Sequence, residues 1–193
     1  MTKTRLEAFS DGVIAIIITI MVLEMKIPKS GDFGELVHLI PTFISYLMSF
    51  LFIGIYWGNH HHLLHIVKHV SSGIMLANLN LLFWLSLVPF ATGWMGENNF
   101  EAPTIATYAV LLNLCGVAYT ILQRIIIKCH TLTEEMQKAI EKQKRKGLIS
   151  IAGYTLAIPF AYINAAISGA LIILIAIIWL VPDKNIERAL NEK

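Results

Sequence analysis

The chain has 193 residues, of which 56% are hydrophobic and only 15% are charged, and its formal net charge is +2. Soluble domains contain about 25% charged residues, so this composition excludes an ordinary soluble domain and indicates a protein that crosses the bilayer several times. The small net charge argues against nucleic acid as a partner, and the two cysteines stand in no metal-binding or disulfide pattern.

The first predicted helix spans residues 5–24 and is short for a helix that faces lipid. Its apolar part, between Asp11 and Glu24, is roughly 18 Å long, whereas the hydrocarbon core is about 30 Å thick. A carboxylate within a membrane segment is costly and indicates a functional position. We therefore expect this helix to lie inside a bundle, with water at both ends.

One face of this helix carries a small residue, aliphatic residues and one hydroxyl. At about 100° per residue, an arc of about 60° contains Gly12, Ile16, Thr19 and Leu23, with Ile20 close by. Asp11 lies off the arc and is expected to point at a neighbouring helix. The arc fits the wall of a narrow apolar pore. It also fits ordinary helix packing, with Thr19 bonded to its own backbone, and periodicity alone favours packing.

Five further membrane helices follow. Loops that contain proline, glycine or charged residues separate the first five helices, and a tight turn near Asn164 precedes the last. The five further helices are predicted at residues 35–62, 72–93, 104–127, 148–162 and 165–181. Residues 128–147 form a charged cytosolic linker, expected to be a helical extension with Thr133 as its cap. The predicted fold class is an all-α integral membrane protein in which residues 1–193 form a single domain of six transmembrane helices.

Lysine and arginine side chains gather on one side of this six-helix arrangement. They precede the first helix, and they recur after the second helix, in the linker 128–147 and after the sixth helix. Lys26 and Lys29 are exceptions, and they are accompanied by Glu24, Asp32 and Glu35. The positive-inside rule therefore places both termini in the cytoplasm.

Polar side chains of the first two helices meet near the cytosolic membrane edge in this topology. They are Arg5, Ser10 and Asp11 on the first helix and Trp57, Asn59, His60 and His61 on the second. We interpret them as a hydrogen-bonded clamp that docks one helix on the other. The alternative is a proton-sensitive gate, because histidine titrates near physiological pH.

A metal site is a further hypothesis for the histidine-rich edge. His61, His65 and His69 are spaced by four residues and share one face if the helix continues, and imidazole binds zinc and copper. No carboxylate or thiolate stands in this stretch to complete a closed site, so we favour a solvated run of histidines and predict no metal.

Enzymatic chemistry has little support in the sequence. No GxSxG, HExxH or glycine-rich phosphate motif occurs, so we do not expect an enzyme. The polar residues inside the apolar segments are expected to form hydrogen bonds between helices; they are Asn78, Asn80, Ser86, Asn113 and Asn164.

Several motifs in the first half of the chain are typical of one family. Arg5, Phe9, Ser10 and Asp11 form the motif R-x-x-x-F-S-D, and Pro41 to Phe50 form P-x-x-x-x-Y-x-x-S-F. Trp57 to His61 read W-x-N-H-H, and Leu79 to Phe90 read L-N-L-L-F-W-L-S-L-V-P-F. With these motifs the chain resembles bacterial members of the transmembrane protein 175 family, which includes the lysosomal potassium channel of animals. The last three helices match that family only in hydropathy and spacing.

The resemblance implies a potassium-selective leak channel in the bacterial inner membrane, assembled as a homotetramer of six-helix subunits. The first helix would line the central pore, with its constriction at Ile16 and further layers at Thr19 and Leu23, in place of a TVGYG carbonyl filter. Gly12, Ile20 and Glu24 would line the pore beside them, although Glu24 also fits a solvated helix end. The motif that contains Phe9 would belong to the helix-docking network. The lipid bilayer, K⁺ and other monovalent cations are the implied partners, with no cofactor beyond the permeant ion.

Two other functions stay open on the sequence. One is a transporter for a metal or small cation, centred on the histidines, although inverted repeats or broken helices are usual for such transporters and neither is evident. The other is a non-conducting membrane scaffold, for which no ion flux is expected.

Overall fold

The computed structural model describes residues 1–130 and 133–180, and every regular element in those ranges is an α-helix. The helices are α1 (Lys3–Leu23), α2 (Phe33–Val37), α3 (Ile40–His65), α4 (Ser72–Ser86), α5 (Val88–Glu97), α6 (Ala102–Cys129), α7 (Glu134–Ile163) and α8 (Ala165–Leu180). The predicted all-α class is confirmed.

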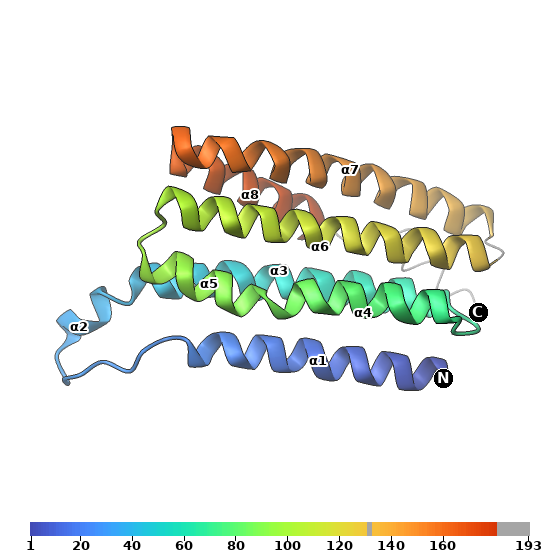
Figure 1. Cartoon of the computed structure of the whole chain (residues 1–193), viewed down its shortest axis with the longest axis horizontal. Helices are drawn as coiled ribbons and strands as arrows, with labels where there is room; N and C mark the ends of the chain where they lie inside the picture. Colours follow the sequence, from blue (N-terminus) through green and yellow to red (C-terminus); the bar gives the residue numbers. More distant parts are fainter. Residues whose placement is uncertain (131–132, 181–193) are drawn as a thin grey trace.

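By length and composition, five segments can cross a membrane. They are α1, α3, α4 together with α5, α6, and the part of α7 from Met136 to Ile163. The apolar helix α8 is shorter over its described residues. Successive long helices run in opposite directions, so the connections lie at the two ends of the bundle (Figure 1).

Proline explains where two predicted helices are divided. Residues 35–62 form the separate helices α2 and α3, and Pro41 stands in the first turn of α3. Residues 72–93 belong to α4 and α5, which are separated at Leu87 with Pro89 in the first turn of α5. Proline has no N–H and its ring clashes with the preceding turn, so each helix is interrupted just before it.

The charged linker predicted over residues 128–147 is mostly helix. The helix α6 extends to Cys129, and α7 begins at Glu134 and continues without interruption to Ile163. Thr133 caps α7, because its hydroxyl accepts a hydrogen bond from the backbone N–H of Met136. The helix therefore continues from a charged segment directly into the apolar one. The predicted end of the sixth helix at residue 181 and the basic residues after it lie outside the described residues.

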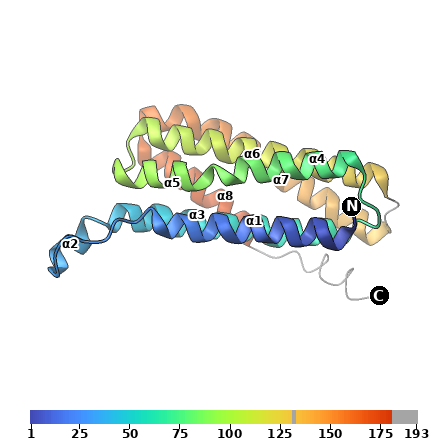
Figure 2. The ribbon, with the colours of Figure 1, turned by 60° about the horizontal axis from the view of Figure 1, so that its bottom comes forward.

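The helix α6 is central to the packing, and α1 is peripheral. The helix α6 packs on α4, α5, α7 and α8, whereas α1 packs on α3, α4 and α5. Both views show α1 along the edge of the bundle and α2 projecting beyond one end (Figures 1 and 2). Our expectation that the first helix lies inside a bundle is thus wrong for a single subunit. Its neighbours cover only one of its faces.

Hydrogen bonds between buried hydroxyls link the middle of the bundle. Ser49 on α3 bonds both Thr92 on α5, at 2.6 Å, and Tyr108 on α6, at 2.8 Å. All three residues are buried, so the bonds satisfy polar groups that would otherwise be costly inside a membrane.

Candidate ion-conduction site

The helix α1 has one packed face and one bare face. Leu6, Ser10, Ile14, Ile17 and Met21 are buried at three- and four-residue spacing. On the opposite face, Ile16 is 58% exposed and Leu23 is 78% exposed, whereas Ile14 is only 1% exposed. Gly12, Thr19 and Ile20 are also exposed. The arc identified from periodicity is therefore the face that the rest of the subunit leaves uncovered.

The Thr19 hydroxyl is engaged by its own helix. It donates to the carbonyl oxygens of Ile16, at 2.9 Å, and Ala15, at 3.2 Å, as the alternative interpretation of this residue expected. A hydroxyl that donates its hydrogen to the backbone keeps oxygen lone pairs. Because Thr19 is exposed on the bare face, those lone pairs remain available to a cation.

An open groove runs beside the bare face, between α1 and α5. Its α1 wall consists of Val13, Ile16, Ile17, Ile20 and Glu24, and its other wall of Ser86, Pro89, Phe90, Gly93, Trp94 and Glu97. The Glu24 carboxylate lies close to α5 on the other wall of the groove, since a β-carbon built on Gly93 would lie 3.5 Å from Glu24 Oε2. Glu24 is thus held near the groove and not directed straight away from the helix end.

Three hydrogen-bonded contacts dock α1 on its neighbours, one of which joins Lys3 Nζ to the backbone carbonyl of His65 on α3 at 3.1 Å. Trp57 Nε1 on α3 donates to Asp11 Oδ1 at 3.0 Å, so Asp11 points at a neighbouring helix. Asn78 Nδ2 on α4 donates to Ser10 Oγ at 2.9 Å, and Asn78 Oδ1 lies 2.7 Å from His60 Nε2. With Asn78 in this orientation, His60 donates through Nε2. Ser10, His60 and Asn78 are almost completely buried.

The predicted docking set is only partly brought together. Within the described part of the chain, the Arg5 guanidinium makes no hydrogen bond or ion pair, and Phe9 is exposed. His61 is exposed and its ring contacts only those of His62 and His65 among the aromatic contacts described. The prediction omitted Asn78 from this set. Its position in an apolar run indicated a bond between helices, but not which helices.

Asn59 belongs to a second network, on the other side of α3. Its side-chain oxygen accepts from Gln143 Nε2 at 3.0 Å, and its backbone carbonyl accepts from the Tyr119 hydroxyl at 3.2 Å. Gln143 in turn accepts from Gln123 Nε2 at 2.9 Å. These bonds join α3 to α6 and α7. They do not dock α1. Adjacent residues of a helix point to different faces, so Asn59 faces α6 and α7 whereas His60 faces the contact between α1 and α4.

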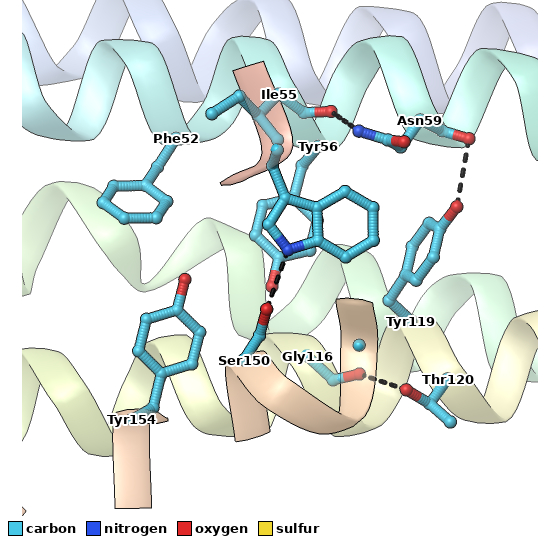
Figure 3. Close-up of a pocket in the computed structure, with 11 residues that line it drawn as sticks. Phe52, Ile55, Tyr56, Asn59, Gly116, Tyr119, Thr120, Ser150 and Tyr154 are labelled. Carbon is cyan, nitrogen blue, oxygen red and sulfur yellow. Dashed lines mark hydrogen bonds between the residues drawn. The ribbon is translucent and has the colours of Figure 1, made fainter. Parts of the chain in front are cut away.

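A small cavity of about 30 Å³ lies beside this second network, among α3, α6, α7 and α8 (Figure 3). Trp179 is one of its lining residues, and the indole N–H of this residue donates to Ser150 Oγ at 2.8 Å. The lining residues are Phe52, Ile55, Tyr56, Asn59, Gly116, Tyr119, Thr120, Gly147, Ser150, Tyr154 and Trp179. The cavity has room for about one or two waters and contains none of the predicted pore residues.

The histidine run does not form the face that a metal site requires. The helix α3 ends at His65, so His69 does not continue the face of His61 and His65. Among residues 1–130 and 133–180, no three histidine, cysteine or carboxylate side chains are grouped to hold a metal ion.

Comparison with known proteins identifies relatives over the whole chain. A family model described as the endosomal/lysosomal potassium channel TMEM175 matches residues 5–89. A protein of Chryseobacterium sp. (strain P1-3), named a potassium channel, is 49% identical over 192 residues, which cover 100% of both chains. A second protein named a potassium channel, from Streptomyces collinus, is 30% identical over an alignment that covers 85% of this chain and 84% of that protein.

The fold is also that of a solved structure. The crystal structure of a lysosomal potassium-selective channel TMEM175 homolog from Chamaesiphon minutus superimposes with a TM-score of 0.82 and 25% sequence identity, covering 93% of this chain and 96% of that one. The resemblance inferred from the motifs is thus confirmed by the fold and by relatives of matching length. Sequence and fold together show that this chain belongs to the TMEM175 family, a family of ion channels and not of enzymes.

Proposed function

We propose that this protein is a potassium-selective leak channel that assembles as a homotetramer around four copies of α1. The observation that carries the proposal is the bare face of α1, because Gly12 and the Thr19 hydroxyl stand on it among aliphatic residues. Lipid can cover a purely apolar face, whereas small and hydroxyl residues are typical of faces that pack on other helices or line a pore. The family and the names of its bacterial relatives support potassium as the permeant ion.

The pore in this proposal is a hydrophobic constriction. Four copies of Ile16 and four of Leu23 would form apolar rings that close by dewetting and open by a small outward movement of the helix. The Thr19 oxygens between them would replace part of the hydration shell of an ion. This replacement favours potassium modestly over sodium, because potassium is the less strongly hydrated ion. Glu24 at the outer end would concentrate cations.

The distribution of charge supports an orientation. One end of the bundle carries Lys3, Arg5, Lys68, Arg124, Lys128 and the lysines of the first half of α7. The other end carries Glu24, Asp32, Glu35 and Glu97 beside Lys26 and Lys29. Basic ends face the cytoplasm in most membrane proteins. We therefore propose the bacterial inner membrane as the location, with both termini cytoplasmic.

Flux of K⁺ and Na⁺ into liposomes tests the proposal. The wild type is expected to pass K⁺ faster than Na⁺, and Ile16→Asn to gain conductance or to lose that preference, because a polar ring no longer dewets. Ile173→Asn is the matched control. Ile173 is 45% exposed on α8, whose packing partners are α3, α6 and α7, so the same substitution there should leave the flux unchanged.

The outcome decides between the proposal and its rivals. Absence of flux from the wild type would contradict the channel and favour a non-conducting scaffold. Flux that responds to replacement of His61 and His65 by phenylalanine, and not to Ile16→Asn, would favour a transporter. Native mass spectrometry tests the assembly, with four copies of the 21.6-kDa chain expected.

A further inference from the structure

An ion pair joins Lys26 to Glu97, a residue that lines the groove beside α1. Lys26 Nζ lies 2.7 Å from Glu97 Oε1. Lys26 follows α1 in the connection to α2, and Glu97 is the last residue of α5. Both side chains are open to solvent, at 78% and 45% exposure. The pair therefore joins two segments that are far apart in the sequence, at the end of the bundle opposite the N-terminus.

This ion pair lies near the end of the groove that borders the bare face of α1. Glu97 and Glu24 line the same groove as Ile16 and Ile20, and both carboxylates act electrostatically on Lys26. Two carboxylates and one ammonium thus share the end of the groove. The sequence analysis named Glu24 as a pore-lining residue, but nothing in the sequence connected Glu97 or Lys26 to that place.

We infer that Glu97 is part of the cation entrance and that Lys26 sets the charge of this entrance by pairing with it. The inference rests on the proposed function. With Lys26 in place, one of the two carboxylates is neutralised, and the entrance attracts cations less strongly than its acidic residues alone would. Lys26 is then a residue that limits the local K⁺ concentration, and with it the flux at low salt.

The alternative role for the pair is a mechanical tether between α1 and α5. Exposed ion pairs stabilise a fold little, because both charges remain solvated and their side chains lose conformational freedom. The field of a charge at an entrance, by contrast, extends over about 10 Å at 0.1 M salt and only about 3 Å at 1 M. The two roles therefore differ in their dependence on salt and in the sign of their effects.

Neutralising each partner separately distinguishes the two roles. Lys26→Gln removes the positive charge and Glu97→Gln the negative one, and each breaks the pair. If the pair sets the entrance charge, K⁺ flux into phosphatidylcholine liposomes at about 0.1 M KCl should rise in Lys26→Gln and fall in Glu97→Gln, each by about twofold or more. Both differences should shrink at about 1 M KCl. If the pair is only a tether, the two variants should change flux in the same direction.

Lys29→Gln is the matched control, because it removes one positive charge from the same exposed connection, where no ion pair to the groove is described. Its effect should be clearly smaller than that of Lys26→Gln. Equal effects of the two lysine variants, or changes of the same sign in Lys26→Gln and Glu97→Gln, would overturn the inference while leaving the channel intact. A wild type that passes no K⁺ would overturn the proposed function and this inference together.

Discussion

Asn78 is the side chain that connects α4 to two other helices. It donates to Ser10 on α1 and lies 2.7 Å from the ring nitrogen of His60 on α3, with all three residues buried. Without it, the His60 ring nitrogen would lose its partner, and Ser10 would keep only its bond to the Leu6 carbonyl. An unsatisfied buried polar group costs more than an average hydrogen bond contributes, so this one residue matters more to docking of α1 than its place in an apolar run indicates.

Replacement of Asn78 by alanine should therefore destabilise the protein. The expected loss is about 1–3 kcal/mol, because the buried His60 ring nitrogen is left without its partner. Ser10 loses one hydrogen bond but still donates to the Leu6 carbonyl at 2.8 Å. Thermal unfolding of the detergent-solubilised protein measures the loss of stability. Asn80→Ala is the matched control, because Asn80 lies on the same helix, is only partly buried and makes no hydrogen bond in the described structure. Similar losses in the two variants would contradict the role assigned to Asn78.

Lys26 offers a test of the ion pair that does not depend on flux. The hydrogen bond and charge of Glu97 raise the pKa of Lys26 above 10.5. A lysine with a raised pKa contributes its stabilisation fully below pH 10.5 and loses it as the pH rises through the raised value. NMR titration of ¹³C-methylated lysines should place the midpoint of Lys26 above 10.5, and Glu97→Gln should lower it. A midpoint that does not respond to Glu97→Gln would show that the pair is absent in solution.

At the scale of elements, close packing of α3 and α5 depends on one glycine. A β-carbon on Gly96 would lie 2.5 Å from Ser45 Oγ and 2.6 Å from the backbone of Thr42. Neither contact is possible without movement, and Thr42 can give way only if α3 shifts. By contrast, a β-carbon on Gly58 meets nothing within 4 Å.

Gly96→Ala should thus destabilise the protein by about 1–3 kcal/mol, as overpacking does. Gly58→Ala should be neutral or slightly stabilising, because alanine is the better residue within a helix. Unfolding temperatures of both variants provide the measurement. If Gly96→Ala proved as stable as the wild type, α3 and α5 would not approach each other as closely as described.

Helix periodicity alone does not show which face of α1 is uncovered or where the third predicted helix is divided. The bare face of α1 was visible in the sequence as an arc, but only packing showed that the arc is uncovered and that Ile14 and Ile17 are buried. The division at Leu87 follows from Pro89, which the sequence placed near the outer end of a single helix. Local rules therefore predicted the faces well and the helix ends less well.

For the whole molecule, the proposed orientation can be tested with the natural cysteines. Cys129 is exposed at the basic end of the bundle, and Cys115 is buried in α6. A maleimide that cannot cross membranes should label the wild type in inverted vesicles and not in intact cells. Labelling should be lost in Cys129→Ser, whereas Lys29→Cys in that background should react in intact cells. The reverse pattern would place the basic end outside.

Composition and pattern by themselves determined that this chain is a helical membrane protein, which end of it is basic, and which face of the first helix differs from the others. These properties depend on residues close together in the sequence and on the transfer of apolar groups out of water, so they can be read without knowing any contact.

Only the tertiary structure decided which polar groups meet. Asn59 and His60 are adjacent, yet one bonds toward α6 and α7 and the other toward α4. Lys26 meets Glu97 across about seventy residues of chain, and Asn78 meets Ser10 over a similar separation. A hydrogen bond or ion pair requires its atoms within about 3 Å in a defined direction, and that precision comes from how whole helices pack, not from the local sequence of either partner.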